Sequence, residues 1–505
     1  MNLTLSQVKH YIHENEKIVL SKEQEAIVTT SFNFLKSFAS DKVIYGINTG
    51  FGPMAQYKIS EENLSELQYN LIRSHSNGTG KPLSEEQVRA VMLCRLNTLS
   101  LGKSGISIGV VNQLVAYLNA EIYPEIFEHG GVGASGDLVQ LAHLALGLIG
   151  EGYVYHKGKR VKTGELIKEK NIQPLELKLR DGLAIINGTS CMTGVGILNY
   201  FHSKNLLDLS ILASSFLNEI ISSYDDSFSK ELNQAKLHIG QQKVAEKMRA
   251  NLSDSKLIRK REEFLFSNTE ESRQDIFREK VQEYYSIRCV PQVLGPVWDT
   301  LEESKNILEQ EINSANDNPI VDLETQHVYH GGNFHGDYIS LEMDKMKLVI
   351  TKLTMLAERQ LNYMLNSKMN EKFPPFLNKK ALGLNFGLQG MQFTATSTTA
   401  ENQMLSNSMY VHSITNNNDN QDIVSMGMNA AIITDRVIEN AYQVMAIEFI
   451  ALCQAVDIID AKNKLSSASH TIYKAIRNLV ATCEDDVPQF EQIKAINDFL
   501  KNYAK

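Results

Sequence analysis

The sequence predicts a mainly α-helical protein built on a long central helical bundle, with a few short β-hairpins. Three observations support this fold class. The 505 residues include only 10 prolines, and residues 337–373 contain neither proline nor glycine. Apolar residues recur at helical spacing over several long segments. Strand-like segments are few and short, and they do not alternate with helices as a parallel sheet requires.

The chain is expected to divide into three parts. Residues 1–200 form an N-terminal domain that carries a glycine-rich turn at residues 131–136. Residues 201–460 form the long-helix bundle, and residues 461–505 form a helical tail without a recognisable motif.

A helix is expected to begin after Ser84, because Ser84 and Gln87 have the spacing of a capping box. Gly102 is expected to end it. The residues on its inward face are expected to be Val88, Val91, Met92, Leu96 and Leu99.

Three longer helices are expected further along. Residues 337–373 allow a helix of roughly 55 Å at about 1.5 Å per residue. Residues 390–409 and about 428–460 also have helical patterns. The apolar residues at helical spacing in the first of these segments are Leu341, Leu348, Val349, Leu353, Leu356 and Leu361.

Two β-hairpins are expected. Residues 153–161 contain a strand-like pattern that turns near Gly158. The segments Ile320-Val-Asp322 and His327-Val-Tyr329 form the second candidate. Both are short, so neither changes the helical fold class.

Composition limits the classes of function. The formal net charge of −9 disfavours a nucleic-acid groove or an anionic membrane surface as partner. The five cysteines are scattered without a C-x-x-C pair, which argues against a disulfide framework and a zinc site. The first residues lack the apolar core of a signal peptide, and no uncharged apolar run reaches about 18 residues. A cytoplasmic protein without a membrane span is therefore expected.

The most distinctive stretch is GGVGASGDL at residues 130–138. Its glycines permit a tight turn, in which the amide nitrogen of Gly136 can reach the carbonyl carbon of Ala134 and close a five-membered ring. Loss of water from Ser135 then leaves a methylene, an electrophile that no standard side chain supplies. Asp137 is placed to orient the reacting groups. Glycine-rich strings before helices also bind phosphate or merely turn the chain, so both interpretations stay open on these residues alone.

The longer string GGVGASGDLVQLAHLALGLIGEG resembles the signature of the aromatic amino acid ammonia-lyases, and the resemblance extends from about residue 43 to residue 428. In that family Ala-Ser-Gly cyclises to 4-methylideneimidazol-5-one (MIO). The resemblance implies that Ala134, Ser135 and Gly136 form this group, supported by Asp137, without a metal or a diffusible cofactor. It also implies the helical fold of the fumarase and ammonia-lyase type, and a homotetramer whose active sites each take residues from three subunits.

Two loop residues acquire roles from the resemblance. Tyr45 lies in YGINTGFG, which matches the family's N-terminal loop. A tyrosine on a glycine-rich loop is more often a packing residue, but the match implies the base that removes the β-proton, with Gly52 in a supporting role. Asn187, in AIINGT, is by itself a turn residue. The resemblance implies that it lies beside the ring and binds the substrate amine or carboxylate.

A third group lies further along the chain. Gln282, Tyr285 and Arg288 are spaced by three, so on a helix they would share one face. A guanidinium pairs bidentately with a carboxylate. The match to the family's Gln-x-x-Tyr-x-x-Arg string implies that Arg288 and Gln282 bind substrate and that Tyr285 is catalytic. Asn318, in NDNP, and Phe334, in GGNFH, match pocket positions of the family.

Two positions are expected to contact the aromatic ring of the substrate and to determine which amino acid is bound. Ser74 and His75 match the family's selectivity pair, which is apolar in the phenylalanine enzymes. His75 can exchange a hydrogen bond with a phenol, although histidine enzymes also carry Ser-His here. At the position of Gln421, histidine enzymes typically carry a glutamate that can pair with an imidazole N–H. Ser74 and His75 together with Gln421 are similar to bacterial tyrosine ammonia-lyases.

We therefore expect non-oxidative deamination of L-tyrosine to trans-4-coumarate and ammonia. Two alternatives use the same electrophile: a histidine ammonia-lyase that makes urocanate, and a tyrosine 2,3-aminomutase that returns the amine to the β-carbon. A catalytically silent helical scaffold is an alternative of another class, but it would need neither the Ala134-Ser135-Gly136 string nor Tyr45. The expected partner is a small amino acid, with neither nucleic acid nor membrane.

Overall fold

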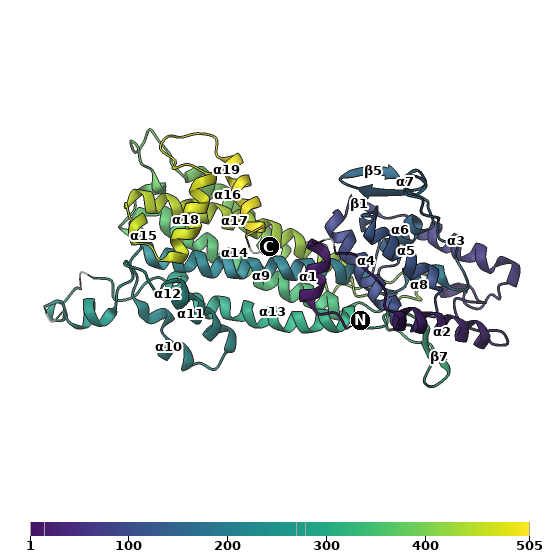
Figure 1. Cartoon of the computed structure of the whole chain (residues 1–505). Helices are drawn as coiled ribbons and strands as arrows, with labels where there is room; N and C mark the ends of the chain where they lie inside the picture. Colours follow the sequence, from purple (N-terminus) through teal and green to yellow (C-terminus); the bar gives the residue numbers. More distant parts are fainter. Residues whose placement is uncertain (1, 15, 269, 278, 504–505) are drawn as a thin grey trace. The chain divides into compact units, whose positions relative to one another are not determined.

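The structure is a computed structural model that describes residues 2–14, 16–268, 270–277 and 279–503. Helices dominate these residues and the strands are few and short, which confirms the predicted fold class (Figure 1). The chain forms two compact units, and it passes from one to the other within four long helices and once in a loop, between Asn407 and Ser408. The first unit comprises Met1–Asn199, Ser304–Asp344 and Ser408–Asp435, and the second comprises Tyr200–Glu303, Lys345–Asn407 and Arg436–Lys505.

The first unit contains the N-terminal helices and all the strands of the described residues. Its helices are α1 (Leu5–His13), α2 (Lys22–Phe38), α3 (Leu64–His75), α4 (Glu85–Ser100), α5 (Ile108–Asn119), α6 (Leu138–Leu148), α7 (Thr163–Glu169) and α8 (Asp181–Ile186). Its strands are β1 (Thr79–Pro82), β2 (Tyr123–Pro124), β3 (Phe127–His129), β4 (Tyr153–His156), β5 (Lys159–Lys162), β6 (Ile320–Asp322) and β7 (His327–Tyr329). Short helical turns lie at Gly52–Met54 and Glu61–Asn63.

The described residues of the second unit form helices joined by loops and contain none of the β-strands. It holds α10 (Lys230–Gln234), α11 (Ile239–Asn251), α12 (Tyr285–Arg288), α15 (Ser367–Asn370), α16 (Gln389–Leu405), α18 (Ser467–Leu479) and α19 (Phe490–Lys501). Short helical turns lie at Asp225–Phe228, Glu262–Phe266, Glu271–Arg273, Pro375–Leu377 and Lys462–Lys464. The helices with residues in both units are α9 (Ser190–Ile220), α13 (Val290–Ile312), α14 (Asp337–Leu365) and α17 (Gly427–Ile458).

Helix α4 confirms its sequence signals. Ser84 caps its first turn and forms the capping box with Gln87. Gly102 follows its end with a φ of +67°, a backbone conformation that glycine adopts without a side-chain clash. The five predicted apolar residues are buried, but so is every other residue from Val88 to Ser100. The helix is thus enclosed on all sides, which its predicted one-sided pattern did not indicate.

The prediction of one continuous helix over residues 337–373 was wrong at its end. Helix α14 ends at Leu365, which makes it roughly 44 Å long at about 1.5 Å per residue. Asn366 leaves the helical conformation, and its side chain accepts a hydrogen bond from the backbone N–H of Lys368 to begin α15. An asparagine can therefore interrupt a helix without proline or glycine, because its side chain replaces a backbone partner.

Both predicted hairpins are confirmed. Strands β4 and β5 pair antiparallel, and the turn between them contains Lys157 and Gly158, both with positive φ. Strand β2 adds to β4 as a third strand. Strands β6 and β7 form the second hairpin. The pairing of β1 with β3, which joins segments about 45 residues apart, had no local sequence signal.

Buried polar contacts join the long helices inside each unit. In the first unit, Asn199 of α9 donates to the carbonyl of Ala431 of α17 at 2.8 Å. In the second, Gln360 of α14 donates to Ser214 of α9 at 3.0 Å. Of the described helices, α17 alone is long and apolar enough to cross a membrane, but 83% of its most apolar window is buried inside the protein. That burial is typical of a core helix.

Candidate active site

The glycine-rich turn immediately precedes α6, as predicted. Gly136 has a φ of +70°, and a Cβ at this position would overlap the backbone of Gly188. The two segments also form a parallel bridge, and the N–H of Asp137 donates to the carbonyl of Gly188 at 2.8 Å. A side chain at residue 136 would therefore separate two backbones that lie in contact.

Asp137 anchors the turn from inside the protein. Its side chain is fully buried, and its Oδ2 accepts hydrogen bonds from the N–H groups of Cys191 and Met192 at 2.8 and 2.9 Å, at the start of α9. Burial raises the pKa of the Asp137 carboxyl to about 7, although these two hydrogen bonds and the positive charge of Arg95 oppose the shift.

This geometry suits the MIO group that the resemblance implies. Gly136 has no side chain to obstruct its own nitrogen, and Ala134 is small and only 5% exposed. Gly188 packs against the turn from one side, so the turn is confined. The residues present therefore fit a ring formed from Ala134, Ser135 and Gly136.

Ser135 opens into a cavity of about 400 Å³. Predicted site residues that line it are Tyr45, Gly52, Ser74, His75, Ser135, Asn187 and Gln421. Apolar walls come from Phe51, Met54, Leu67, Leu71, Leu138, Leu183 and Ile186. Apolar walls with a few convergent polar groups are typical of a small-molecule site. None of the described lining residues is an Asp, Glu, Lys or Arg.

Tyr45 lines this cavity and lies between two buried isoleucines of its loop. Ile44 and Ile47 are buried in a cluster with Leu35 of α2 and with the β6–β7 hairpin. The Tyr45 hydroxyl oxygen accepts a hydrogen bond from the N–H of Gly52 at 3.1 Å. The loop is thus fixed at both ends of its YGINTGFG segment.

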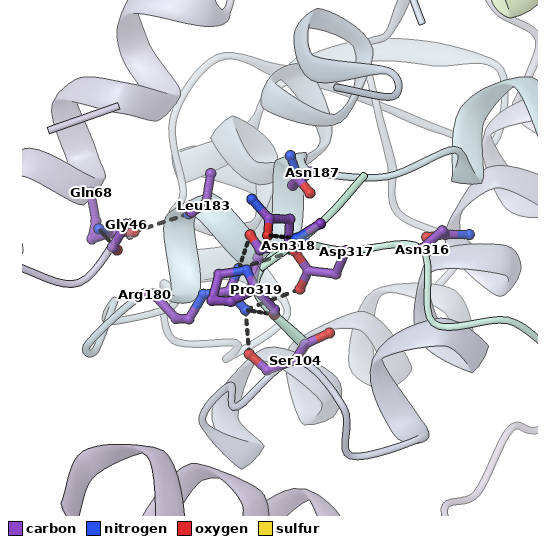
Figure 2. Close-up of polar contacts among 12 residues, drawn as sticks. Gly46, Gln68, Ser104, Arg180, Leu183, Asn187, Asn316, Asp317, Asn318 and Pro319 are labelled. Atoms are coloured by element: carbon purple, nitrogen blue, oxygen red, sulfur yellow. Dashed lines mark hydrogen bonds and ion pairs between the residues drawn. The ribbon is translucent and has the colours of Figure 1, made fainter. Parts of the chain in front are cut away.

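A buried glutamine joins the Tyr45 loop to α8. Gln68 is 1% exposed; its Nε2 donates to the carbonyl of Gly46 at 3.4 Å, and its Oε1 accepts from the N–H of Leu183 at 3.0 Å (Figure 2). Sequence reasoning missed Gln68. The available signal was the pair Leu67 and Leu71, which are one helical turn apart beside Gln68 on α3. Both leucines line the cavity.

His75 ends α3, and one of its ring nitrogens already has a partner. Nδ1 lies 2.9 Å from the carbonyl oxygen of Leu71, so Nδ1 carries a hydrogen and donates it. Ser74 Oγ lies 3.0 Å from the same nitrogen. In the neutral ring, Nε2 is then an acceptor.

Gln421 ends a tight loop that begins at Asn416, and these two residues exchange backbone hydrogen bonds. Between them, Asn417, Asn418 and Asp419 all have positive φ. Gln421 Nε2 donates to Ser135 Oγ at 3.0 Å. Four further polar residues line the cavity and were not predicted, although three of them belong to the Asn-rich run before Gln421: Asn70, Asn417, Asn418 and Asn420.

Asn187 follows the last residue of α8 and is 4% exposed. Its side-chain Oδ1 is buried and has no hydrogen-bond partner among the described residues. A buried amide oxygen without a partner costs free energy, which a bound N–H donor would recover. Asn187 is therefore poised to accept a hydrogen bond from a ligand.

Asn318 and Phe334 lie in the first unit but do not line the cavity. Asn318 Oδ1 accepts from the N–H of Gly331 at 2.9 Å. Its carbonyl accepts from Arg180, whose guanidinium pairs with Asp317 at 3.0 Å in a completely buried ion pair (Figure 2). The side chain of Phe334 is partly buried.

Gln282, Tyr285 and Arg288 belong to the second unit, and none lines the cavity. They do lie together: Arg288 donates to the side-chain oxygen of Gln282, and its guanidinium lies 4.7 Å from the centre of the Tyr285 ring. The expectation of one helical face was wrong, because α12 begins at Tyr285 and Gln282 precedes it. Tyr285 is 72% exposed.

Two further observations concern metal ligands and cysteines among the described residues. No group of three or more His, Cys, Asp or Glu side chains that could hold a metal ion occurs among them. All five cysteines are free thiols.

Known proteins share this architecture. A family profile described as "Aromatic amino acid lyase" matches residues 3–478. A histidine ammonia-lyase of Geobacillus sp. (strain WCH70) is 37% identical over 500 residues, which cover 99% of this chain and 95% of that protein. An MIO-dependent tyrosine 2,3-aminomutase of Streptomyces globisporus is 38% identical over 504 residues, which cover 99% and 93%.

Solved structures agree with these relatives. The crystal structure of the tyrosine aminomutase from Streptomyces globisporus has a TM-score of 0.95 at 37% identity, covering 99% of this chain and 95% of that one. The histidine ammonia-lyase from Trypanosoma cruzi has a TM-score of 0.88 at 30% identity, covering 99% and 92%. With the glycine-rich turn and the match across residues 3–478, these likenesses show that the chain belongs to the aromatic amino acid lyase family.

Proposed function

We propose that the protein is a tyrosine ammonia-lyase, which converts L-tyrosine to trans-4-coumarate and ammonia. The observation that carries the proposal is the Nε2 of His75, which has no hydrogen-bond partner among the described residues, in a cavity whose other side chains are apolar, amide or hydroxyl groups. A phenol hydroxyl can donate to that nitrogen, whereas the ring of phenylalanine would leave it unpaired at a cost of about 1–3 kcal/mol.

The electrophile is assigned to Ala134, Ser135 and Gly136. Once formed, MIO would supply an electrophilic methylene that takes up the substrate amine and makes it a leaving group. The crowded backbone at Gly136 and Gly188 supports this assignment. Gln421 donates to Ser135 Oγ and so orients the side chain that has to lose water.

Tyr45 is proposed as the base that removes the β-proton. The N–H that Gly52 donates to its hydroxyl oxygen fixes the position of that oxygen, which is the atom that would take the proton. The loop that carries Tyr45 is anchored by Ile44, Ile47 and Gln68, so the phenol is held in one position. A fixed approach to the substrate favours proton transfer.

The substrate carboxylate needs a cation that the lining residues of this cavity do not include. Arg288, with Gln282, is the proposed clamp, and the exposed Tyr285 beside them keeps its proposed catalytic role. We propose that these residues complete the cavity of another copy of the chain, in a homotetramer with shared active sites. Asn318 and Phe334 keep their proposed substrate-binding roles within that assembly.

Gln421 opposes histidine as the substrate. Its neutral amide oxygen can accept a hydrogen bond from an imidazole N–H but cannot supply the negative charge of a carboxylate that would pair with the ring. The histidine ammonia-lyase relatives therefore support the proposed type of reaction more strongly than they support histidine as the substrate.

A tyrosine 2,3-aminomutase is the second candidate, because relatives of that name are 38% identical to this chain. The cavity residues that would read the tyrosine ring serve both reactions. The difference lies in whether the ammonia leaves the site or returns to the β-carbon.

Product absorbance tests the proposal, with L-tyrosine, L-phenylalanine and L-histidine supplied separately to the full chain at equal concentration. Fastest release of coumarate is expected. Urocanate as the main product would overturn the tyrosine assignment while leaving the electrophile in place. Chromatography of the tyrosine reaction for β-tyrosine separates the two candidates, since its accumulation ahead of coumarate would identify a mutase.

A further inference from the structure

Arg95 is a fully buried cation behind the glycine-rich turn, and the proposed mechanism does not use it. It lies on α4 and is 0% exposed. Its Nη2 donates to the carbonyls of Ala184 and Asn187, the latter at 2.7 Å. Its Nη1 donates to Asn316 Oδ1 at 3.2 Å and to Ser190 Oγ at 3.3 Å. The guanidinium thus donates hydrogen bonds to three residues of the segment that contains Asn187: Ala184, Asn187 itself and Ser190.

All four of these partners are neutral oxygens, so among the described residues Arg95 has no direct ion pair. Burial lowers the pKa of the Arg95 guanidinium to about 10, with the negative charge of Asp317 as the largest opposing effect. The group is still charged at neutral pH. Burying such a charge costs free energy that an apolar side chain of similar volume would avoid. Stability alone therefore gives no reason to place arginine here.

What the guanidinium holds is the backbone that confines the turn. A Cβ on Gly188 would overlap Arg95 Nη1 and Asn316 on one side. On the other side, a Cβ on Gly136 would overlap the carbonyl of Gly188, and that carbonyl also accepts the N–H of Asp137 at 2.8 Å. Arg95, Gly188 and Gly136 are consequently stacked, with no space for a side chain between them.

We propose that Arg95 is a positioning residue for ring closure: by holding the Asn187 carbonyl, it presses Gly188 against Gly136 and keeps the Ala134–Gly136 turn compressed. The inference rests on the proposed function, since it concerns how the electrophile of that site is made.

The step that Arg95 assists loses two water molecules. The Gly136 nitrogen forms a bond to the carbonyl carbon of Ala134. The Ala134 oxygen leaves as water with the amide hydrogens of Gly136 and Ser135, and a C=N bond remains. The Ser135 hydroxyl then leaves as the second water with the Cα hydrogen of Ser135, and a C=C bond remains. The reaction needs no oxidant or reductant.

The test compares Arg95→Met with Arg89→Met in the full-length chain. Arg89 is a matched control, because it also lies buried on α4 and donates to the backbone carbonyls of Tyr11 and Leu118 at 2.8 and 3.2 Å, away from the turn. Intact mass, followed over time after a short expression, reports the fraction of chains that have lost two waters. Thermal denaturation of each variant reports the accompanying change in stability.

Misplacement of the reacting atoms by on the order of 1 Å slows a positioned reaction about 100-fold. Arg95→Met is therefore expected to accumulate folded chains that keep both waters, whereas Arg89→Met loses both waters as fast as the wild type despite a lower Tm. Arg95→Lys keeps the charge but not the planar fork, so it is expected to close the ring at an intermediate rate. If Arg95→Met does not fold, Arg95→Lys is compared with Arg89→Met in its place.

Ring closure at the wild-type rate in the folded Arg95 variants would overturn the positioning role, and so would an equal delay in Arg89→Met, which would indicate general destabilisation. A wild-type chain that never loses two waters would overturn the proposed electrophile and this inference with it. The two failures are distinguished by the wild-type mass.

Discussion

His75 offers a substrate one ring nitrogen, because Leu71 occupies the other at 2.9 Å. His75→Leu removes that acceptor and leaves an apolar wall. Loss of a hydrogen bond to the tyrosine hydroxyl is expected to lower kcat/KM for L-tyrosine about 10- to 100-fold, with L-phenylalanine unchanged or improved. Initial rates of coumarate and cinnamate formation measure this. An equal loss for both substrates would mean that His75 supports the fold and does not read the ring.

Asp137 is a buried carboxyl whose charged form is disfavoured, and its pKa is raised from 3.8 to about 7. The folded protein therefore holds this proton more tightly than the unfolded chain does. The contribution of Asp137 to stability is fully present below pH 3.8 and is lost as the pH rises towards 7, by up to roughly 4 kcal/mol.

Asp137→Asn stays neutral at every pH and should lack this slope. The Tm of the wild type is thus expected to fall relative to that of Asp137→Asn between pH 4 and pH 7, and to run parallel to it above pH 8. A constant difference across the whole range would mean that Asp137 is charged throughout.

At the scale of an element, the loop from Asn416 to Gln421 places the Gln421 amide beside Ser135, and three of its residues adopt an unfavourable backbone conformation. Asn417, Asn418 and Asp419 have φ values of 55°, 52° and 57°, a region that residues other than glycine occupy at a cost. Asparagine and aspartate tolerate this region better than most residues. The Asn-rich run in the sequence therefore has a conformational reason.

Asp419 is exposed and does not line the cavity, so its substitution tests the backbone alone. Asp419→Gly is expected to leave Tm unchanged or to raise it. Asp419→Val is expected to destabilise the protein by about 1–2 kcal/mol, because a β-branched residue is disfavoured at positive φ. Thermal denaturation measures both variants. Equal stability of the two would show that the loop readily adopts another conformation.

At the scale of the whole molecule, the described residues that line the cavity include no Lys or Arg for the proposed substrate's carboxylate, while Arg288 lies with the exposed Tyr285 in the other unit. Co-expression of Tyr45→Phe with Arg288→Met tests whether copies share sites. If Arg288 acts in another copy's site, random assembly gives roughly a quarter of the sites both intact groups. Activity should then return in the mixture although each variant alone is inactive.

The matched comparison is Tyr45→Phe with Asn187→Ala, two residues that line the same cavity. No site of that mixture contains both intact groups, so its activity should stay at the level of the separate variants. An inactive mixture of Tyr45→Phe and Arg288→Met would contradict shared sites.

Much of the fold and part of the site were predictable because they depend on neighbours in the chain. The Ser84–Gln87 capping box, the Lys157–Gly158 turn and the Ala134-Ser135-Gly136 string each bring together residues a few positions apart. Such signals depend on backbone conformation and local hydrogen bonds, which a short window contains.

The sequence by itself determined the helical class, the two hairpins, the family and the glycine-rich turn before α6. Only the tertiary structure decided that Gly188 packs against Gly136, that Leu71 fixes the hydrogen on His75, and that Arg288 is not among the residues that line the cavity. The physical reason is distance along the chain: close packing and burial join segments tens to hundreds of residues apart, and no local pattern specifies which buried surfaces meet.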